Sequence, residues 1–221
     1  MTVAPLPVTV LVVAKAPVPG LAKTRLAASV GEKAAADIAA AALLDPLDAV
    51  ATTPGTHRVV AMTGNLQRAC RADEIRARLA GFSVIDQRGD GFAERLANAH
   101  ADAAELGQPV LQIGMDTPQV RPDLLAACAR RLLTAPAVLG MARDGGWWVL
   151  GVADGTHAGC LREVPMSRPD TGALTCTALE RLGIPVALAD ELCDVDTVDD
   201  IAVVRAACRP SSRFTQATQG V

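Results

Sequence analysis

The chain has 221 residues, half of them hydrophobic, which suits a single α/β domain with a sizeable core. A net charge of −3, no Tyr, three Phe and two Trp argue against a nucleic-acid surface, an anionic-membrane binder or a stacking platform for single strands. Six scattered cysteines without a C-x-x-C pair predict reduced thiols in a cytoplasmic protein. No secretory signal is visible, and the Ala-rich run 34–44 is too short for a membrane span.

Apolar, β-branched runs alternate with Ala/Leu/Arg-rich stretches, which predicts a mostly parallel sheet with helices on both faces. The expected strands are 8–14, 58–62, 82–85, 110–113, 137–141, 147–152 and 186–188. The expected helices are 32–50, 66–79, 92–106, 123–133, 171–182 and 198–207. Strands 137–141 and 147–152 are too close for a helical crossover, so the sheet must be mixed. We expect one domain over 8–208, with disordered tails at 1–7 and 209–221.

A basic loop follows the first expected strand. Its sequence, Ala14 to Leu26, contains Pro17, Pro19 and Gly20, which favour a constrained loop over a helix. Lys15, Lys23 and Arg25 can converge from it on the carboxyl edge of the sheet, where exposed N–H groups and positive charge suit a phosphate chain. It matches neither a Walker A loop nor G-x-G-x-x-G, and a solvated basic loop is the alternative.

Carboxylates follow two other segments. Gly114-Met115-Asp116-Thr117-Pro118 comes directly after an apolar strand, so Asp116 either holds a hard divalent cation or opens a turn. Near the end of the chain, Thr197 is a good N-cap for the last expected helix. Asp194 and Asp196 precede that cap and repel each other unless a cation or a basic group lies between them.

Two glycine-containing loops have two interpretations each. Gln87 to Phe92 either caps the following helix through Asp90 or Gly91, or faces a nucleobase or sugar through Gln87 and the loop backbone. Asp144-Gly145-Gly146, between two expected strands, is either a hairpin turn or a place where the backbone approaches a ligand closely.

Four segments together resemble a known family: 14–26 (AKAPVPGLAKTRL), 114–118 (GMDTP), 144–151 (DGGWWVLG) and 194–200 (DVDTVDD). In this order they resemble the bacterial radical-SAM/selenodomain-associated transferases, and QRGDGFAER at 87–95 agrees with that pattern. The resemblance implies a single-domain, Rossmann-like GT-A fold of the nucleotide-diphospho-sugar transferase superfamily. More distantly, the chain is similar to molybdopterin-cofactor and phospholactate nucleotidyltransferases.

The resemblance also implies roles for individual residues. It places Lys15, Lys23 and Arg25 on phosphates, Asp116 and Asp196 on Mg2+ or Mn2+ with Asp194 as a helper, and Asp144 near the acceptor or sugar. Further contacts with the nucleotide donor are expected from Ala14, Gly20, Gln87, Asp90, Gly145 and Gly146.

Three functions follow as hypotheses. The first is nucleotidyl transfer from a nucleoside triphosphate to a small acceptor, with pyrophosphate as leaving group. The second is glycosyl transfer from a nucleotide-diphospho-sugar, with Asp144 as the candidate base. The third, a non-enzymatic nucleotide-binding protein, predicts that the basic residues and carboxylates are scattered in space. The sequence leaves the oligomeric state open.

Overall fold

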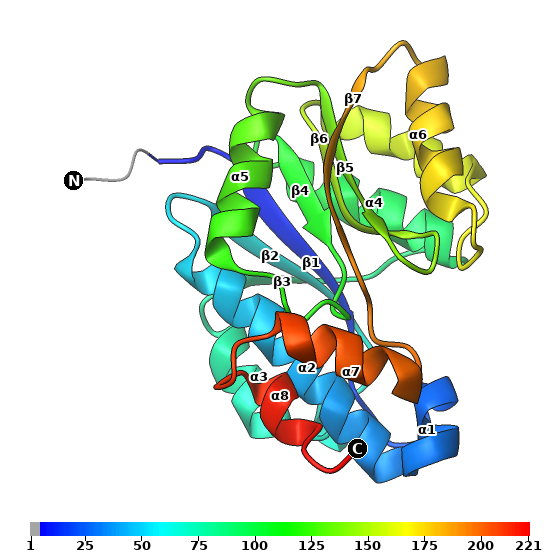
Figure 1. Ribbon diagram of the computed structural model, residues 1–221. Helices are drawn as coiled ribbons and strands as arrows, with labels where there is room; N and C mark the ends of the chain where they lie inside the picture. Colours follow the sequence, from blue (N-terminus) through cyan, green and yellow to red (C-terminus); the bar gives the residue numbers. More distant parts are fainter. Residues whose placement is uncertain (1–4) are drawn as a thin grey trace.

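A computed structural model describes residues 5–221 as a seven-stranded sheet between two layers of helices (Figure 1). The strands are β1 Thr9–Lys15, β2 His57–Thr63, β3 Ser83–Asp86, β4 Val110–Ile113, β5 Ala137–Ala142, β6 Trp147–Val152 and β7 Val186–Leu192. The α-helices are α1 Thr24–Val30, α2 Glu32–Thr52, α3 Ala72–Leu79, α4 Phe92–Ala104, α5 Pro122–Leu132, α6 Thr171–Arg181, α7 Val198–Ala207 and α8 Arg213–Ala217. Two 3-10 helices, η1 Leu66–Arg68 and η2 Gly155–Glu163, complete the described elements.

The strand order is β3-β2-β1-β4-β6-β5-β7. β1 runs parallel to β2 and β4, β2 is parallel to β3, and β5 is parallel to β7. β6 alone is antiparallel, to both β4 and β5, which confirms the mixed sheet expected from the short 137–152 connection. The carboxyl ends of six strands therefore lie at one edge of the sheet, together with the amino end of β6.

Both faces of the sheet are covered by helices, as predicted. Alternate residues of β1 belong to separate apolar clusters, Val10 and Val12 to one and Leu11 and Val13 to the other. The first cluster contains side chains of α2, α3 and α5, whereas the second contains side chains of α4, η2 and α6. β1 is buried on both sides, which explains why its sequence is continuously apolar.

The C-terminal segment corrects the prediction of a disordered tail at 209–221. It forms α8, and Phe214 is fully buried in a third apolar cluster with Leu26, Ile38 and Ile201 from α1, α2 and α7. Both carboxylate oxygens of Asp45 accept backbone N–H groups, from Arg213 at 3.0 Å and Phe214 at 2.9 Å. This apolar and polar anchoring to α2 orders a segment whose composition alone favoured disorder.

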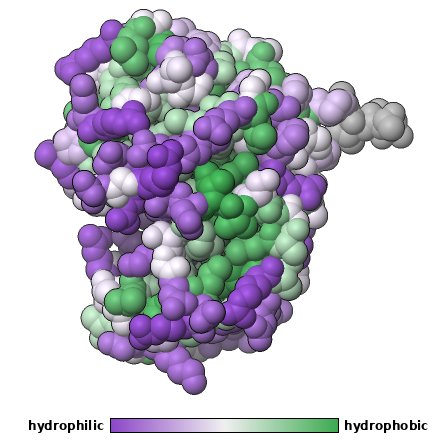
Figure 2. All heavy atoms as spheres, turned by 180° about the vertical axis from the view of Figure 1, so that it is seen from behind, coloured by the Kyte–Doolittle hydropathy of each residue, from purple (hydrophilic) through white to green (hydrophobic). Residues whose placement is uncertain are grey.

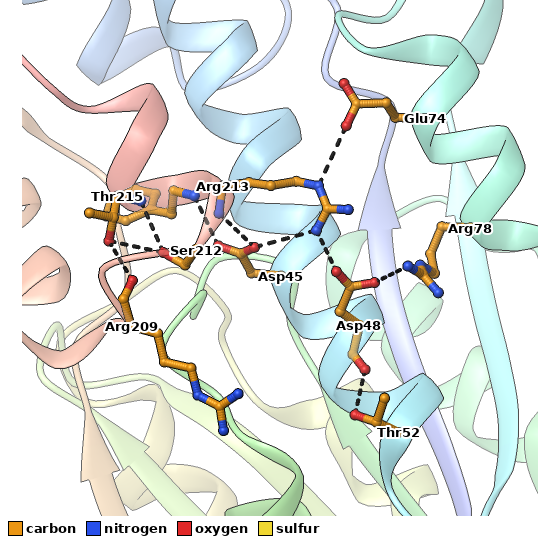
Figure 3. Close-up of polar contacts among 10 residues, drawn as sticks. Asp45, Asp48, Thr52, Glu74, Arg78, Arg209, Ser212, Arg213 and Thr215 are labelled. Atoms are coloured by element: carbon orange, nitrogen blue, oxygen red, sulfur yellow. Dashed lines mark hydrogen bonds and ion pairs between the residues drawn. The ribbon is translucent and has the colours of Figure 1, made fainter.

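Arg213 adds a charged anchor to the same segment. Its guanidinium pairs with Asp45 and Asp48 of α2 and with Glu74 of α3, and Arg78 approaches Asp48 from α3 (Figure 3).

Of the expected N-terminal tail 1–7, residues 1–4 lie outside the described part. Residues 5–7 have no helix or strand, although Leu6 is buried.

Most expected elements agree with the structure to within a few residues, with four differences besides α8. The helix expected over 66–79 is divided into η1 and α3, because Arg71 adopts a left-handed φ of 51° between them. β7 continues to Leu192, beyond the expected end at 188, and α1 and η2 come from segments where no helix was expected. Across residues 5–221, no helix combines the length and apolar character needed to cross a membrane.

Candidate active site

Three loops bring four acidic side chains to the carboxyl edge of the sheet. Asp116 follows β4, Asp144 lies in the β5–β6 turn, and Asp194 and Asp196 follow β7. The backbone N–H of Val195 donates to the Asp116 carbonyl at 3.1 Å, so the loops after β4 and β7 are joined directly. Val195 is itself buried in the third apolar cluster, which anchors the two aspartates that flank it.

A basic side chain links two of these carboxylates. Lys23 Nζ lies 3.0 Å from Asp116 Oδ2 and 2.7 Å from Asp196 Oδ1, and the Lys23 side chain is only 10% exposed. Arg25 Nη1 reaches the other oxygen of Asp196 at 3.1 Å from a side chain that is 71% exposed. The structure therefore brings Asp116 and Asp196 together, but through Lys23, for which sequence reasoning expected a phosphate contact.

The pKa values in this cluster reflect burial and ion pairing together. Burial acts to lower the pKa of Lys23, but Asp116 and Asp196 outweigh it and raise that pKa above its ordinary value. Burial acts to raise the pKa of Asp196, but Lys23 and Arg25 hold it below its ordinary value. Lys23 is thus a charged ammonium at neutral pH, paired with ionised Asp196.

Asp194 differs from its neighbour. Burial, followed by the charges of Asp144 and Asp196, raises the pKa of Asp194 to about 6. The cluster therefore holds one carboxyl that takes up a proton near neutral pH, next to another that stays ionised. Pairs of this kind concentrate at functional sites.

Two adjoining pockets open beside the cluster, of about 410 and 430 Å3. Both are lined by Lys15, Met115, Asp116, Ser167 and Asp196, so these residues form the wall between them. Seen from behind, a band of hydrophobic residues crosses the middle of the molecule between two largely polar regions (Figure 2).

Most of the predicted site residues line these pockets. The first pocket includes Ala14, Lys15, Gln87, Asp116, Asp144, Gly146, Asp194 and Asp196. The second includes Lys15, Lys23, Arg25, Asp116 and Asp196. Gly20, Asp90 and Gly145 line neither pocket.

Local contacts account for the three predicted residues outside the pocket walls. Gly20 has a φ of +76° and packs near the Glu32 carboxylate, and the Asp90 N–H bonds to Glu94 Oε2 at 2.9 Å. Gly145 has a φ of +88°, and a Cβ there would lie 1.8 Å from the Pro169 carbonyl oxygen. Gly145 is therefore needed for the close approach of two protein segments.

Gln87 and Asp144 are both fixed by hydrogen bonds at the pocket wall. Gln87 Nε2 donates to the carbonyls of Ala14 at 2.8 Å and Ala61 at 2.9 Å, so the amide is held across the ends of β1 and β2. Asp144 Oδ1 accepts the Gly146 N–H at 2.7 Å, which is the bond of a tight turn. The second carboxylate oxygen of Asp144 is not used in that turn.

Sequence reasoning missed the pocket wall formed by α4 and the segment before α6. Phe92, Arg95 and Leu96 line the first pocket from α4, Met166 to Arg168 line it from the segment before α6, and Thr171 lines it from the first position of α6. Ser167 has a left-handed φ of 59°, which is uncommon for serine. The cluster of Ser, Pro, Asp, Thr and Gly at 167–172 was the available signal of a constrained loop.

The donor set of this cluster consists of carboxylates, which are ligands that a hard divalent cation prefers. Asp116 and Asp196 offer carboxylate oxygens, and Asp116 Oδ1 is buried without a hydrogen-bond partner. Within residues 5–221, no three His, Cys, Asp or Glu side chains gather as a metal-binding group. Mg2+ is commonly held by one or two carboxylates together with substrate phosphates, so this pair fits such a cation when phosphate oxygens complete the shell.

Comparison with known proteins supports the fold. The search of curated proteins found no match. The DUF2064 family, described as "Uncharacterized protein conserved in bacteria", matches residues 46–168, more than half of the chain. A structure of a proposed nucleotide-diphospho-sugar transferase from Desulfovibrio desulfuricans G20 has a TM-score of 0.83 at 23% identity, covering 96% of this chain and 94% of that one.

Two further structures share the fold at greater distance. CMP:2-keto-3-deoxy-manno-octonic acid synthetase, complexed with CTP, has a TM-score of 0.57 at 14% identity, covering 90% of this chain and 97% of that one. Rv0371c from Mycobacterium tuberculosis H37Rv, in complex with manganese, has a TM-score of 0.53 at 19% identity, covering 89% and 97%. These similarities confirm the expected GT-A-like α/β fold of the nucleotide-diphospho-sugar transferases.

Proposed function

The chain belongs to the DUF2064 family of bacterial proteins, and we propose that it is a divalent-cation-dependent transferase that uses a nucleotide donor. Its preferred reaction is nucleotidyl transfer from a nucleoside triphosphate to a small acceptor. The observation that carries the proposal is the meeting of Asp116, Asp196 and Lys23, distant in sequence, beside a pocket at the carboxyl edge of the sheet. Open α/β sheets bind their ligands at that edge.

Each group of the site has a place in this reaction. The acceptor oxygen forms a bond to the α-phosphorus as the bond from that phosphorus to the bridging oxygen breaks, and pyrophosphate leaves. Asp116 and Asp196 would hold Mg2+ or Mn2+, with Asp194 as a helper, and the cation would neutralise charge on phosphate oxygens. Lys15, Lys23 and Arg25 would bind the pyrophosphate part of the donor, and the pocket wall with Ala14 and Gln87 would hold the nucleoside.

Two features of the relatives support this reading. One structure with the same fold is complexed with CTP and another with manganese, so the fold accommodates both a nucleotide and a divalent cation in those proteins. The motif resemblance also leads us to group the chain with the radical-SAM/selenodomain-associated transferases.

Glycosyl transfer from a nucleotide-diphospho-sugar is the second candidate. Asp144 favours it, because this carboxylate lines the same pocket as Asp116 and keeps one oxygen outside its turn bond. In that reaction Asp144 would accept the proton of the acceptor hydroxyl, and the bound cation would serve the diphosphate leaving group.

Product analysis distinguishes these reactions. The protein is incubated with Mg2+, each nucleoside triphosphate and a pool of cell metabolites, and pyrophosphate is measured; nucleotide sugars are then tested for release of nucleoside diphosphate. Pyrophosphate release that depends on both Mg2+ and an acceptor supports nucleotidyl transfer. Release of nucleoside diphosphate instead supports glycosyl transfer, and no product in either assay contradicts the proposed enzyme.

A substitution tests the cation site itself. Asp116→Asn should weaken Mg2+-dependent nucleotide binding by at least about tenfold, a loss that even outer-shell partners of a metal can cause. Asp73→Asn is the matched control, because Asp73 is an almost fully exposed carboxylate paired with Arg76 on α3. Equal nucleotide affinity in the two variants, measured by calorimetry with and without Mg2+, would show that Asp116 has no part in cation binding.

A further inference from the structure

Lys23 sits where a cation shared by Asp116 and Asp196 would bind. Its ammonium contacts one oxygen of each carboxylate, at 3.0 and 2.7 Å. Lys23 precedes α1 with a left-handed φ of 49°, a backbone conformation that non-glycine residues seldom adopt. The backbone and the buried side chain together hold the ammonium in this position.

The remaining oxygens of the pair are less accessible to a cation. Asp196 Oδ2 is bonded to Arg25, and Asp116 Oδ1 is buried without a partner. A divalent cation therefore reaches both carboxylates most directly through the two oxygens that Lys23 now holds. Two positive charges cannot share these oxygens at contact distance without strong repulsion, so the ammonium and the divalent cation exclude each other.

We propose that Lys23 competes with the divalent cation for Asp116 and Asp196, so that the cation binds weakly until a polyphosphate offers the ammonium a new partner. This inference rests on the proposed function, because it assumes the cation site at these two carboxylates. When the phosphates of the donor bind, Lys23 exchanges carboxylate oxygens for phosphate oxygens and releases the pair to the cation. Cation and donor then strengthen each other's binding by the same factor.

Lys23 is a positioning residue in this account. A purely structural lysine would join the loops after β4 and β7 and have no influence on the cation beyond its charge. Substitution of Arg25 distinguishes a positioning role of Lys23 from a purely structural one. Arg25 carries the same charge and contacts the same Asp196 but does not lie between the carboxylates. Arg25→Met is therefore the matched control for Lys23→Met.

The test is the affinity of the full-length chain for Mn2+ alone, measured from the electron paramagnetic resonance signal of free Mn2+. Lys23→Met should bind Mn2+ at least about tenfold more tightly than the unsubstituted protein, a coupling of ordinary size. Arg25→Met should gain no more than about threefold, as expected for loss of one exposed ion pair. Equal gains in Mn2+ affinity in the two variants would overturn the proposed competition between Lys23 and the cation.

Two additional variants keep the result interpretable. Lys23→Gln replaces Lys23→Met if the latter fails to show the circular dichroism spectrum and cooperative melting of the unsubstituted chain. Adding Asp116→Asn to the Lys23 variant should remove the gain, which assigns the Mn2+ to this pair; a gain that persists contradicts the inference. Failure of the proposed function appears separately, as nucleotide binding that is indifferent to Asp116→Asn in a chain that keeps Lys23.

Discussion

Replacing Gly145 with alanine should damage the site through the backbone rather than through any lost side chain. Gly145 lies in the β5–β6 turn at a φ of +88°, and its carbonyl accepts the Gly172 N–H at 2.8 Å. A Cβ would lie 1.8 Å from the Pro169 carbonyl oxygen, whereas real Cβ contacts essentially never fall below 3.0 Å. The β5–β6 turn and the segment before α6 must therefore separate by about 1.2 Å, the difference between these two distances.

Gly183 is a reference for the free energy of unfolding that Gly145→Ala should lose. Gly183 has a similar φ of +75° but nothing within 4 Å of its Cβ position, so Gly183→Ala should cost only the left-handed strain of roughly 1–2 kcal/mol. Gly145→Ala adds the clash and the strained Gly172 bond, for a total of about 3 kcal/mol or more. Urea unfolding followed by circular dichroism measures both. Free energies of unfolding of the two variants that agree within about 0.5 kcal/mol would show that the Pro169 carbonyl does not exclude a Cβ at Gly145.

Two further predictions concern the core. Burial lowers the pKa of His100 to about 4, so the unfolded chain, with a histidine pKa near 6.5, binds the proton first as the pH falls. The stability that His100 contributes is present above pH 6.5 and should decline by about 2 kcal/mol between pH 7 and pH 5. His100→Gln should lack this decline. Identical pH profiles of the variant and the unsubstituted protein in urea unfolding would contradict the prediction. Phe214→Ala should lose about 3–5 kcal/mol because the ring is fully buried, whereas Leu182→Ala, at a side chain 56% exposed, should change little. Thermal melting compares the two, and equal melting temperatures would mean that α8 does not anchor the C-terminal segment.

The regular elements of the sheet were accessible from sequence because their signals are local. A buried strand such as β1 reads as an unbroken apolar run, and the short connection between β5 and β6 leaves only an antiparallel pairing. α1 and α8 were missed because they have only seven and five residues. The order of the C-terminal segment depends on contacts of Arg213 and Phe214 with α2, which are distant in sequence and leave no local pattern.

The candidate site was predictable in its residues and less so in its geometry. A carboxylate placed directly after a parallel strand must lie at the carboxyl edge, so the placement of Asp116, Asp194 and Asp196 at one edge follows from the strand directions. β6 and β5 lie between β4 and β7, and the two loops meet only because the segment after β7 returns to β4, where the Val195 N–H bonds to the Asp116 carbonyl. The direction of a long, flexible lysine does not follow from strand order. Lys23 faces the carboxylates because the conformation of its own loop turns it there. The pocket wall around Ser167 was missed for a similar reason, since it depends on how the segment before α6 meets the β5–β6 turn.

The most direct test of the cation site is an anomalous difference map from crystals of the full-length chain grown with Mn2+ and a nucleoside triphosphate. We expect a Mn2+ peak coordinated by Asp116, Asp196 and phosphate oxygens, with the Lys23 ammonium turned from the carboxylates onto the phosphates. A nucleotide and Mn2+ bound elsewhere, with Lys23 still between the two carboxylates, would contradict it.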